Sequence, residues 1–324
     1  MLGGNAASGG DLHLSADSLT GGVASRVTAE GDIGLTLSGD GDWQGTLTAG
    51  RDLQLQANKL NNHGQLAANR DSRVQAQQLT NTGLMQAQGA QNLTGRQLDN
   101  SGKLQAGGTL TINADGVNNQ GLIGSQQRLD LTVKNGLNLD GTLYADGPLR
   151  VQAGEFLLAG SATGKQGVAF HGGALKTAQG SSLLSDGDIA LQADEVRLGG
   201  LLSAERELTI DSQRLIAAAS GQTQAKQGMS LTVAEGAQLA GVFSTLGDLK
   251  VSGATVDNTG EIGARNLDWR GNYLSQRGQL HASEQLTLAV NRLDQQGELL
   301  AGKQLTLRGE RLPSIKRSWL NPPE

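Results

Sequence analysis

The sequence has no cysteine and is poor in proline and aromatic residues. Without cysteine, the chain has no disulfide, no thiol nucleophile and no cysteine-based zinc or iron–sulfur site. Four Pro, three Trp, two Tyr and three Phe leave an apolar fraction made mainly of Leu, Val, Ile and Ala. Any core is therefore aliphatic. The lack of cysteine suits the cytosol, and it also suits an exported chain that travels unfolded.

An excess of charge of one sign is also missing. Lys and Arg number 26 and Asp and Glu 31, so the formal net charge is −5. A nucleic-acid-binding surface or a basic membrane patch needs clustered Lys and Arg, and the sequence predicts neither. No apolar run reaches the ~18 residues of a membrane span, and the start does not have the pattern of a signal peptide.

Glycine is abundant, with 48 residues, and it belongs to an internal repeat. From Leu47 the unit reads L-x-A-x3-L-x-L-x-A-x2-L-x-N-x-G-x, and it recurs every nineteen residues. The next copies open at Leu66, Met85, Leu104 and Ile123. Weaker copies open at Val27, Leu143, Leu183, Leu202, Phe243, Ile262, Leu280 and Leu299. We count about fifteen nearly contiguous units over the whole chain, of which these are the clearest, and such a period indicates a solenoid.

Apolar and polar residues alternate within each unit, which is the period of a β-strand. Each unit divides into three short strands separated by turn-like pieces. A leucine-rich repeat has a similar length, but its convex side is usually helical or extended, whereas the alternation here runs around the whole unit. The repeat therefore predicts an all-β fold, a parallel β-helix of about 15 coils with mostly 19 residues per coil. Each coil is too small to bury a core alone, so stacking supplies it.

The Asn and Gly of the repeat predict a stacked turn. Asn62, Asn81, Asn100 and Asn119 would lie about 4.8 Å apart, with side-chain amides hydrogen-bonded along the axis. Asn tolerates the left-handed conformation of a tight turn, and Gly tolerates it better. We therefore expect that conformation at this turn. The alternative is that these Asn side chains contact a glycan or another ligand.

Four segments break the repeat, and departures of this kind predict loops on one face, where solenoids usually bind. Three stretches of equal length begin at Leu35, Leu131 and Leu231, about a hundred residues apart, which suggests a higher-order repeat. The four broken segments are residues 38–45, 134–141, 171–181 and 216–228.

The acidic residues suggest two sites that the sequence does not favour. Asp40 and Asp42 resemble a calcium loop, but hard cations need more oxygens than two carboxylates supply. Asp186 and Asp188 resemble the carboxylate pair of a polysaccharide-active enzyme, although a solvated turn also explains them. We therefore predict no metal, no cofactor and no catalytic residue.

The histidines and tryptophans give one candidate. The histidines are far apart and lack metal-ligand spacing, and no nucleophile elbow accompanies them. Trp269 alternates with Leu267 and is expected in the core. Trp43 lies in a broken segment and is the candidate for an exposed carbohydrate contact, and Trp319 lies in the tail. The histidines are His13, His63, His171 and His281.

Residues 98–125, LDNSGKLQAGGTLTINADGVNNQGLIGS, and their neighbours resemble the filamentous haemagglutinin repeats of Gram-negative two-partner-secretion exoproteins. The resemblance spans roughly residues 10–312. It implies a long right-handed β-helical filament that crosses the outer membrane through a dedicated transporter and is secreted to the cell surface. The family includes haemagglutinin-type adhesins and the stalks of contact-dependent growth inhibition effectors, so a host or target-cell receptor is an implied partner.

The sequence thus divides into a non-repeat start (1–10), a β-helix (11–312) and a non-repeat tail (313–324). Its leading interpretation is a structural shaft segment that presents an adhesive or toxic tip. A glycan- or receptor-binding module that uses the broken segments is the second interpretation, and a β-helical polysaccharide-active enzyme is the third. Exposed strand edges predict a monomeric rod with some end-to-end association.

Overall fold

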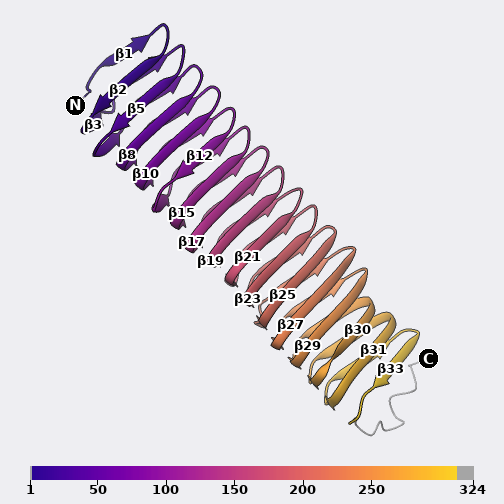
Figure 1. The fold of residues 1–324 in the computed structure, drawn as a ribbon. Helices are drawn as coiled ribbons and strands as arrows, with labels where there is room; N and C mark the ends of the chain where they lie inside the picture. Colours follow the sequence, from indigo (N-terminus) through magenta and orange to yellow (C-terminus); the bar gives the residue numbers. More distant parts are fainter. Residues whose placement is uncertain (1, 312–324) are drawn as a thin grey trace.

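The computed structural model describes residues 2–311, so the predicted tail 313–324 and Trp319 lie outside the described residues. The described residues form one rod (Figure 1), a solenoid of about 16 turns with ~19 residues per turn. All 33 strands join one sheet of parallel pairs, and the described residues include no helix. The predicted parallel β-helix is confirmed, with about one turn more than the repeat count.

Each coil has three faces, which the chain follows in the order A, B, C. Face A consists of short strands: β1 (Asn5–Ser8), β4 (Arg26–Ala29), β7 (Thr46–Ala49), β9 (Gln65–Ala68), β11 (Leu84–Ala87), β14 (Lys103–Ala106), β16 (Leu122–Ser125), β18 (Thr142–Ala145), β20 (Ser161–Gly164), β22 (Ser182–Ser185), β24 (Leu201–Ala204), β26 (Gln222–Ala225), β28 (Val242–Thr245) and β32 (Glu298–Ala301). β1 lies within residues 1–10, which the sequence predicts to be outside the repeat, and it pairs in register with β4.

Faces B and C are formed by separate strands in only a few coils. These are β2 (Leu12–Ala16), β5 (Ile33–Leu37), β12 (Gln91–Thr94) and β33 (Gln304–Arg308) on face B, and β3 (Leu19–Gly21), β6 (Asp40–Trp43) and β13 (Gln97–Asn100) on face C.

Elsewhere one long strand bends from face B into face C. These strands are β8 (Leu53–Asn62), β10 (Ser72–Asn81), β15 (Leu110–Asn119), β17 (Leu129–Leu139), β19 (Leu149–Leu158), β21 (Val168–Thr177), β23 (Ile189–Leu198), β25 (Glu207–Ala217), β27 (Gly228–Leu239) and β29 (Asp248–Asn258). β30 (Glu261–Gln276) and β31 (Gln279–Gln295) run through all three faces. Most coils therefore have two strands, and not the three that the sequence predicts.

Strand β8 shows why the chain can bend without leaving the ladder. Leu53, Leu55 and Ala57 point inward, and the residues between them are exposed. Asn58 and Lys59 then follow each other on the outside, which shifts the inward phase by one residue. The chain changes direction at Asn58, which has no partner in the register with β10, and the pairing resumes at Lys59 on face C. We call this point the B–C bend.

The core is a continuous aliphatic column along the rod axis, as the composition predicts. Leu, Ile, Val and Ala fill most inward positions, and nearly all are under a tenth exposed. The few large rings lie among them: Trp269 is fully buried, and Phe156 packs on Phe170 with ring centroids 5.9 Å apart. The predicted core position of Trp269 is confirmed.

The expectation of loops at the broken segments is wrong for residues 38–45 and 134–141, which lie largely in strands, whereas 171–181 and 216–228 each contain a tight turn. Residues 134–139 lie inside β17, whose extra residue is absorbed as a β-bulge between Val133 and Gly136. An equivalent bulge lies in β27, and both occur at the B–C bend. Longer coils add residues at the corner between faces C and A, as a tight turn at 178–181 in which Ser181 N–H donates to the carbonyl of Ala178. Insertions enter the corners because the parallel ladders on the faces hold the register.

Candidate functional site

The predicted asparagine ladder is confirmed. Asn62 Nδ2 donates to Asn81 Oδ1 at 2.7 Å, Asn81 to Asn100 at 2.7 Å, and Asn100 to Asn119 at 2.6 Å. All four side chains are at most 2% exposed. Within the core the amides form a continuous chain of hydrogen bonds along the axis.

Each amide nitrogen of the ladder also reaches the backbone beyond its corner. Asn100 Nδ2 lies 3.2 Å from the carbonyl oxygen of Leu122, the first residue of β16 in the next coil. Asn81 makes the same contact with Lys103 at 3.2 Å. Because both amide hydrogens have partners inside the rod, these side chains fix the corner and are not available to a ligand.

The ladder is interrupted in the middle of the rod. The stacked column continues from Asn119 into residues that are mostly aliphatic, and amides return at Asn258, which donates to Gln276 Oε1 at 2.8 Å. Gln276 was not foreseen, because its coil has 18 residues and its type departs from the motif. The intervening column is Leu139, Leu158, Thr177, Leu198, Ala217 and Leu239.

Glycine is required next to the ladder for a different reason from the one that the sequence predicts. No residue of this glycine column has a positive φ, so the left-handed turn predicted from the sequence is wrong. A Cβ on Gly102 would instead lie 2.1 Å from the carbonyl oxygen of Gly83. Gly83 stands in the same relation to Gly64, and Gly121 to Gly102. Glycine is required because each corner stacks directly on the backbone of the corner before it.

The expectation that Trp43 is exposed is wrong. Its side chain is 3% exposed, because Trp43 pairs with Asn62 and occupies the same inward column as the ladder. The indole fills the space left by the missing side chain of Gly21, where a Cβ would lie 2.3 Å from Trp43 Cε3. The nineteen-residue step from Asn62 back to Trp43 could have revealed this position in the sequence. A buried indole offers no stacking platform to a carbohydrate.

The acidic pairs singled out in the sequence do not gather further ligands. Asp40 accepts a long hydrogen bond from Asn58 Nδ2 at 3.4 Å. Asp188 accepts the backbone N–H of Glu207 at 3.2 Å and lies 3.3 Å from Arg206. Among residues 2–311, no group of three or more His, Asp or Glu side chains could hold a metal ion.

The structure does not bring the four histidines together. His63 Nδ1 lies 2.8 Å from Thr82 Oγ1 at the corner between faces C and A. His171 points outward from face B, where Nδ1 lies 3.2 Å from Gln192 Oε1. His13 lies on face B of the first coil and His281 on face A near the other end. Their spacing along the rod matches no shared site.

An aspartate ladder at the corner between faces A and B was not foreseen. Asp11 Oδ1 accepts the backbone N–H of Asp32 at 2.8 Å, and Asp32 accepts that of Asp52 at 3.0 Å. Asp52 accepts from Asp71 at 3.1 Å, and Asp71 from Ala90 at 2.8 Å. We call this corner the A–B corner. The irregular spacing of these residues, which follows coils of different length, conceals the column in the sequence.

Two arginines neutralise this acidic column. Arg70 donates Nε to Asp52 Oδ1 at 2.6 Å and Nη2 to Oδ2 at 2.5 Å. This pairing holds the pKa of Asp52 below its usual value. The pKa of Asp11 is also lowered, first by the backbone N–H of Asp32 and then by Arg51. Adjacent carboxylates are therefore tolerated because each accepts a hydrogen bond from the next coil.

We expect acid to weaken the rod at this corner. Because the folded-state pKa values of Asp11 and Asp52 are lowered, the two carboxylates stabilise the fold above the ordinary Asp pKa of about 3.9. That contribution is lost as the pH falls through their folded-state values. Thermal unfolding, followed by circular dichroism between pH 7 and 2, should show a melting temperature that falls below about pH 4. Asp52→Asn should flatten this decline more than Asp40→Asn on face C, and equal slopes in both variants would contradict the assignment.

The family comparison supports the same repeat that the structure displays. The model of the haemagglutinin repeat matches residues 2–36, 44–105, 86–139, 105–193 and 144–314. The chain belongs to the haemagglutinin repeat family. Neither a comparison with curated proteins nor one with solved structures gives a match.

Haemagglutinin repeats are structural or adhesive and not enzymatic, and the proteins that carry them are generally secreted surface adhesins. In this chain the repeats correspond to coils, and the match extends over the broken segments 134–141, 171–181 and 216–228 but leaves out residues 37–43. Among the described residues, no helix is long and apolar enough to cross a membrane.

The described part of the haemagglutinin-repeat rod carries shallow hollows on its surface. One hollow of about 680 Å³ runs along the B–C bend, where glycines leave the backbone bare. Uncharged hydrogen-bonding side chains form one wall, and Asp115 and Lys134 are the charged residues that line it. The wall consists of Thr94, Asn113, Thr132, Gln152 and His171.

Proposed function

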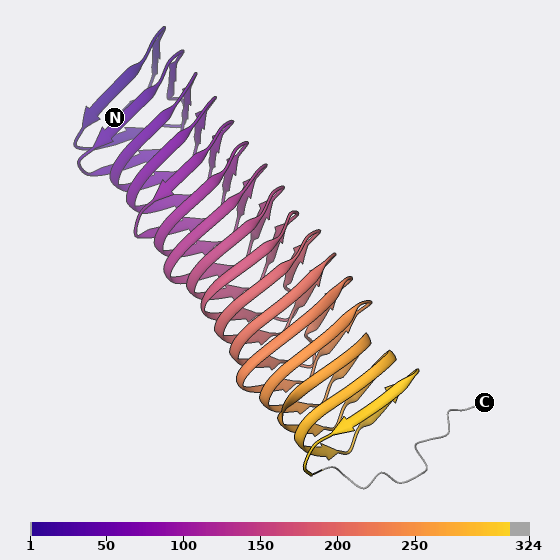
Figure 2. The same cartoon turned by 45° about the vertical axis from the view of Figure 1, so that its right-hand side comes forward.

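We propose that the chain is a shaft segment of a secreted bacterial surface filament, and that it holds an adhesive or toxic tip away from the cell. The observation that carries this proposal is the uninterrupted stack of parallel coils from end to end of the described residues. Figure 2 shows no break or side domain along the rod. A structure of this kind supplies length and stiffness rather than a reaction centre.

The polar outside and the cysteine-free composition support export. A chain without disulfides can cross a pore unfolded and then fold by adding one coil to the last, since each coil contacts only its neighbours. We therefore include in the proposal an outer-membrane two-partner-secretion transporter as partner and the surface of a Gram-negative bacterium as location. Both the adhesin and the growth-inhibition stalk use a shaft in this way.

A spacer experiment tests the shaft proposal. The chain is displayed on cells between a surface anchor and an epitope, and a second version lacks the four regular coils spanning 46–121. Removing four coils at about 4.8 Å each should shorten the reach of the epitope by about 19 Å and leave its display unchanged. The height of the epitope is measured with a labelled antibody fragment. Equal heights in the two versions, or loss of display in the shorter one, would contradict a modular shaft.

The hollow at the B–C bend favours a second candidate function, binding of a neutral glycan. The Asn, Thr and Gln side chains of its wall can hydrogen-bond to sugar hydroxyls. The hollow is also lined by Lys134, which belongs to a broken segment. A glycan array probed with the whole chain separates the two functions. Thr132→Ala and Gln152→Ala should abolish any signal if the hollow binds glycan, whereas a pure shaft gives no signal at all.

A further inference from the structure

One continuous part of the surface contains no charged residue. Charged residues make up 18% of the chain, yet five consecutive coils lack them on face A and on the corner that precedes it. Asp140 and Glu261 are the first charged residues beyond either end of this region. We call the region the uncharged strip, and it consists of residues 159–164, 178–185, 199–204, 218–225 and 240–245.

The side chains that point out of the strands of the strip are small hydroxyls, two glutamines and three aliphatic residues. Leu184 and Ser203 lie in one column on neighbouring strands, and Leu201 lies beside Ser203 on the same strand. All three are half-buried, whereas the tight turns of the strip at 178–181 and 218–221 carry exposed residues. The outward residues of its strands are Ser161, Thr163, Ser182, Leu184, Leu201, Ser203, Gln222, Gln224, Val242 and Ser244.

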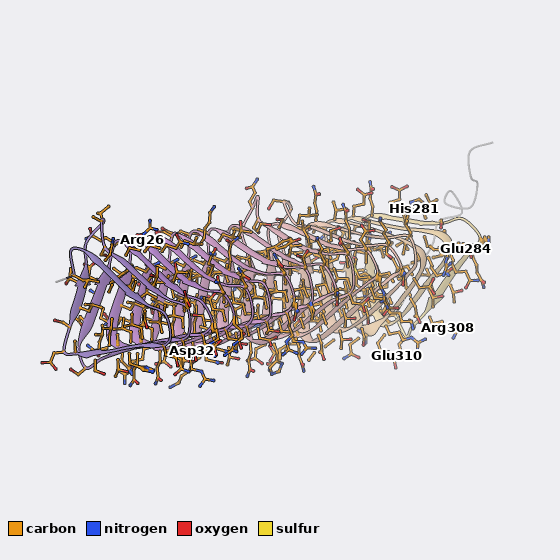
Figure 3. All side chains as sticks on the ribbon, turned by 90° about the horizontal axis from the view of Figure 1, so that it is seen from above. Arg26, Asp32, His281, Glu284, Arg308 and Glu310 are labelled. Atoms are coloured by element: carbon orange, nitrogen blue, oxygen red, sulfur yellow. The ribbon has the colours of Figure 1, made fainter. Side chains whose placement is uncertain are left out.

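Charged residues border the strip along the same coils, at the A–B corner and on face C, whereas face B carries few, among them Asp211 and Lys250. On the A–B corner Lys165 pairs with Asp146, and Lys226 pairs with Glu205. Face C carries its own ion pairs. Figure 3 shows charged side chains toward both ends of the rod, among them Arg26 and Arg308. The strip is therefore a bounded region and does not reflect a general lack of charge.

We propose that the uncharged strip is a lateral contact surface for a second copy of this chain, lying alongside it and pointing in the same direction. Side chains on the strip repeat every ~4.8 Å along the axis. A partner face packs evenly against such ridges only if it has the same repeat, and a second copy supplies one. Two uncharged strips also meet without opposing like charges, whereas face C carries Glu155, Lys176 and Glu195.

The charged border decides the direction. In a pair related by a two-fold axis parallel to the rods, the A–B corner of each chain lies over the uncharged corner of the other. In an antiparallel pair centred on β24, the two A–B corners would meet instead, and Glu205 would face its own copy. The parallel pair avoids this repulsion.

The size of the strip sets the strength of the contact. Five strands about 4.8 Å apart, with segments of six to eight residues, cover roughly 450 Å² on each chain. About 900 Å² in total is the size of a weak, transient interface. Shafts anchored side by side on one surface would be held at high effective concentration, which makes a weak contact sufficient. This last consequence rests on the proposed function, whereas the contact itself does not.

Engineered cysteines test the contact and its direction, because the chain has no cysteine of its own. In a parallel pair Thr163→Cys and Ser244→Cys should each cross-link with its own copy under mild oxidation. Ser230→Cys, a half-buried outward serine on face B, is the matched control. We expect disulfide-linked dimers to form at least ~10-fold faster in the two strip variants than in the control. Equal rates at all three positions would overturn the proposal, and cross-linking only in a mixture of the two strip variants would overturn the parallel direction.

A charge at the centre of the strip tests the contact without cross-linking. In sedimentation equilibrium, the unmodified chain should rise above monomer mass with concentration. Ser203→Asp should stay monomeric, and Ser230→Asp should behave like the unmodified chain, with equal circular dichroism for all three. Small-angle scattering should show a wider cross-section at constant length. Greater length at constant cross-section, or a monomer at every concentration, would overturn the lateral contact and leave the shaft proposal untouched.

Discussion

Replacing Gly102 by Ala is expected to lower the free energy of unfolding by about 2–3 kcal/mol. The added Cβ would lie 2.1 Å from the carbonyl oxygen of Gly83, which is backbone and has no rotamer to change. The two coils must separate at this corner. Separation also lengthens the hydrogen bond of 2.7 Å from Asn81 to Asn100, two residues away.

Gly263→Ala is the matched control, because its Cβ would meet nothing within 4 Å on face A. There the substitution should be neutral or stabilise by up to about 1 kcal/mol through the unfolded chain. Urea unfolding followed by circular dichroism measures both variants. Similar stabilities for Gly102→Ala and Gly263→Ala would mean that corner stacking does not require glycine.

Replacing Asn100 by Leu should cost about 1–3 kcal/mol, with no loss of any binding activity. The change removes the acceptor of Asn81 and the donor to Asn119, and it leaves polar atoms unpaired in a dry core. Leucine itself fits this column, since Leu139 and Leu158 occupy it in later coils. The cost therefore arises from the broken hydrogen bonds and not from the shape of the side chain.

A variant with all four ladder asparagines changed to leucine separates these causes. It removes both partners of each amide–amide bond, so its cost should be well below four times that of the single variant. Denaturant unfolding of the two variants supplies the comparison. Additive costs would show that the asparagines act independently, and a lost ligand at unchanged stability would assign them to binding.

The fold could be predicted from the sequence because its two periods are both visible in the chain. Alternation gives the strands, and the nineteen-residue step gives the stacking that places Asn62 on Asn81. Two of the broken segments form tight turns and the other two lie largely in strands, because the ladder on each face tolerates extra residues only at corners and bends. The aspartate column from Asp11 to Asp71 is not visible in the sequence, because coils of unequal length make the spacing between its members irregular.

The local backbone conformation is the part of the structure that is hardest to predict from the sequence. The sequence shows that Gly102 is required but not why, and close stacking and a left-handed turn both select glycine. The sequence around Trp43 looks irregular and predicts a loop, although the distance from Trp43 to Asn62 is one regular coil. The uncharged strip is spread over five segments, so it becomes visible only when the coils are stacked.

The distance between two engineered cysteines on face A tests the rod most directly. Thr28 and Leu300 occupy the same outward column of face A near opposite ends of the rod. Roughly 14 coil spacings of about 4.8 Å separate them, or about 67 Å. With spin labels on Thr28→Cys and Leu300→Cys, electron paramagnetic resonance should give one narrow distribution near that distance. A much shorter distance, or a broad distribution, would contradict a continuous rigid solenoid.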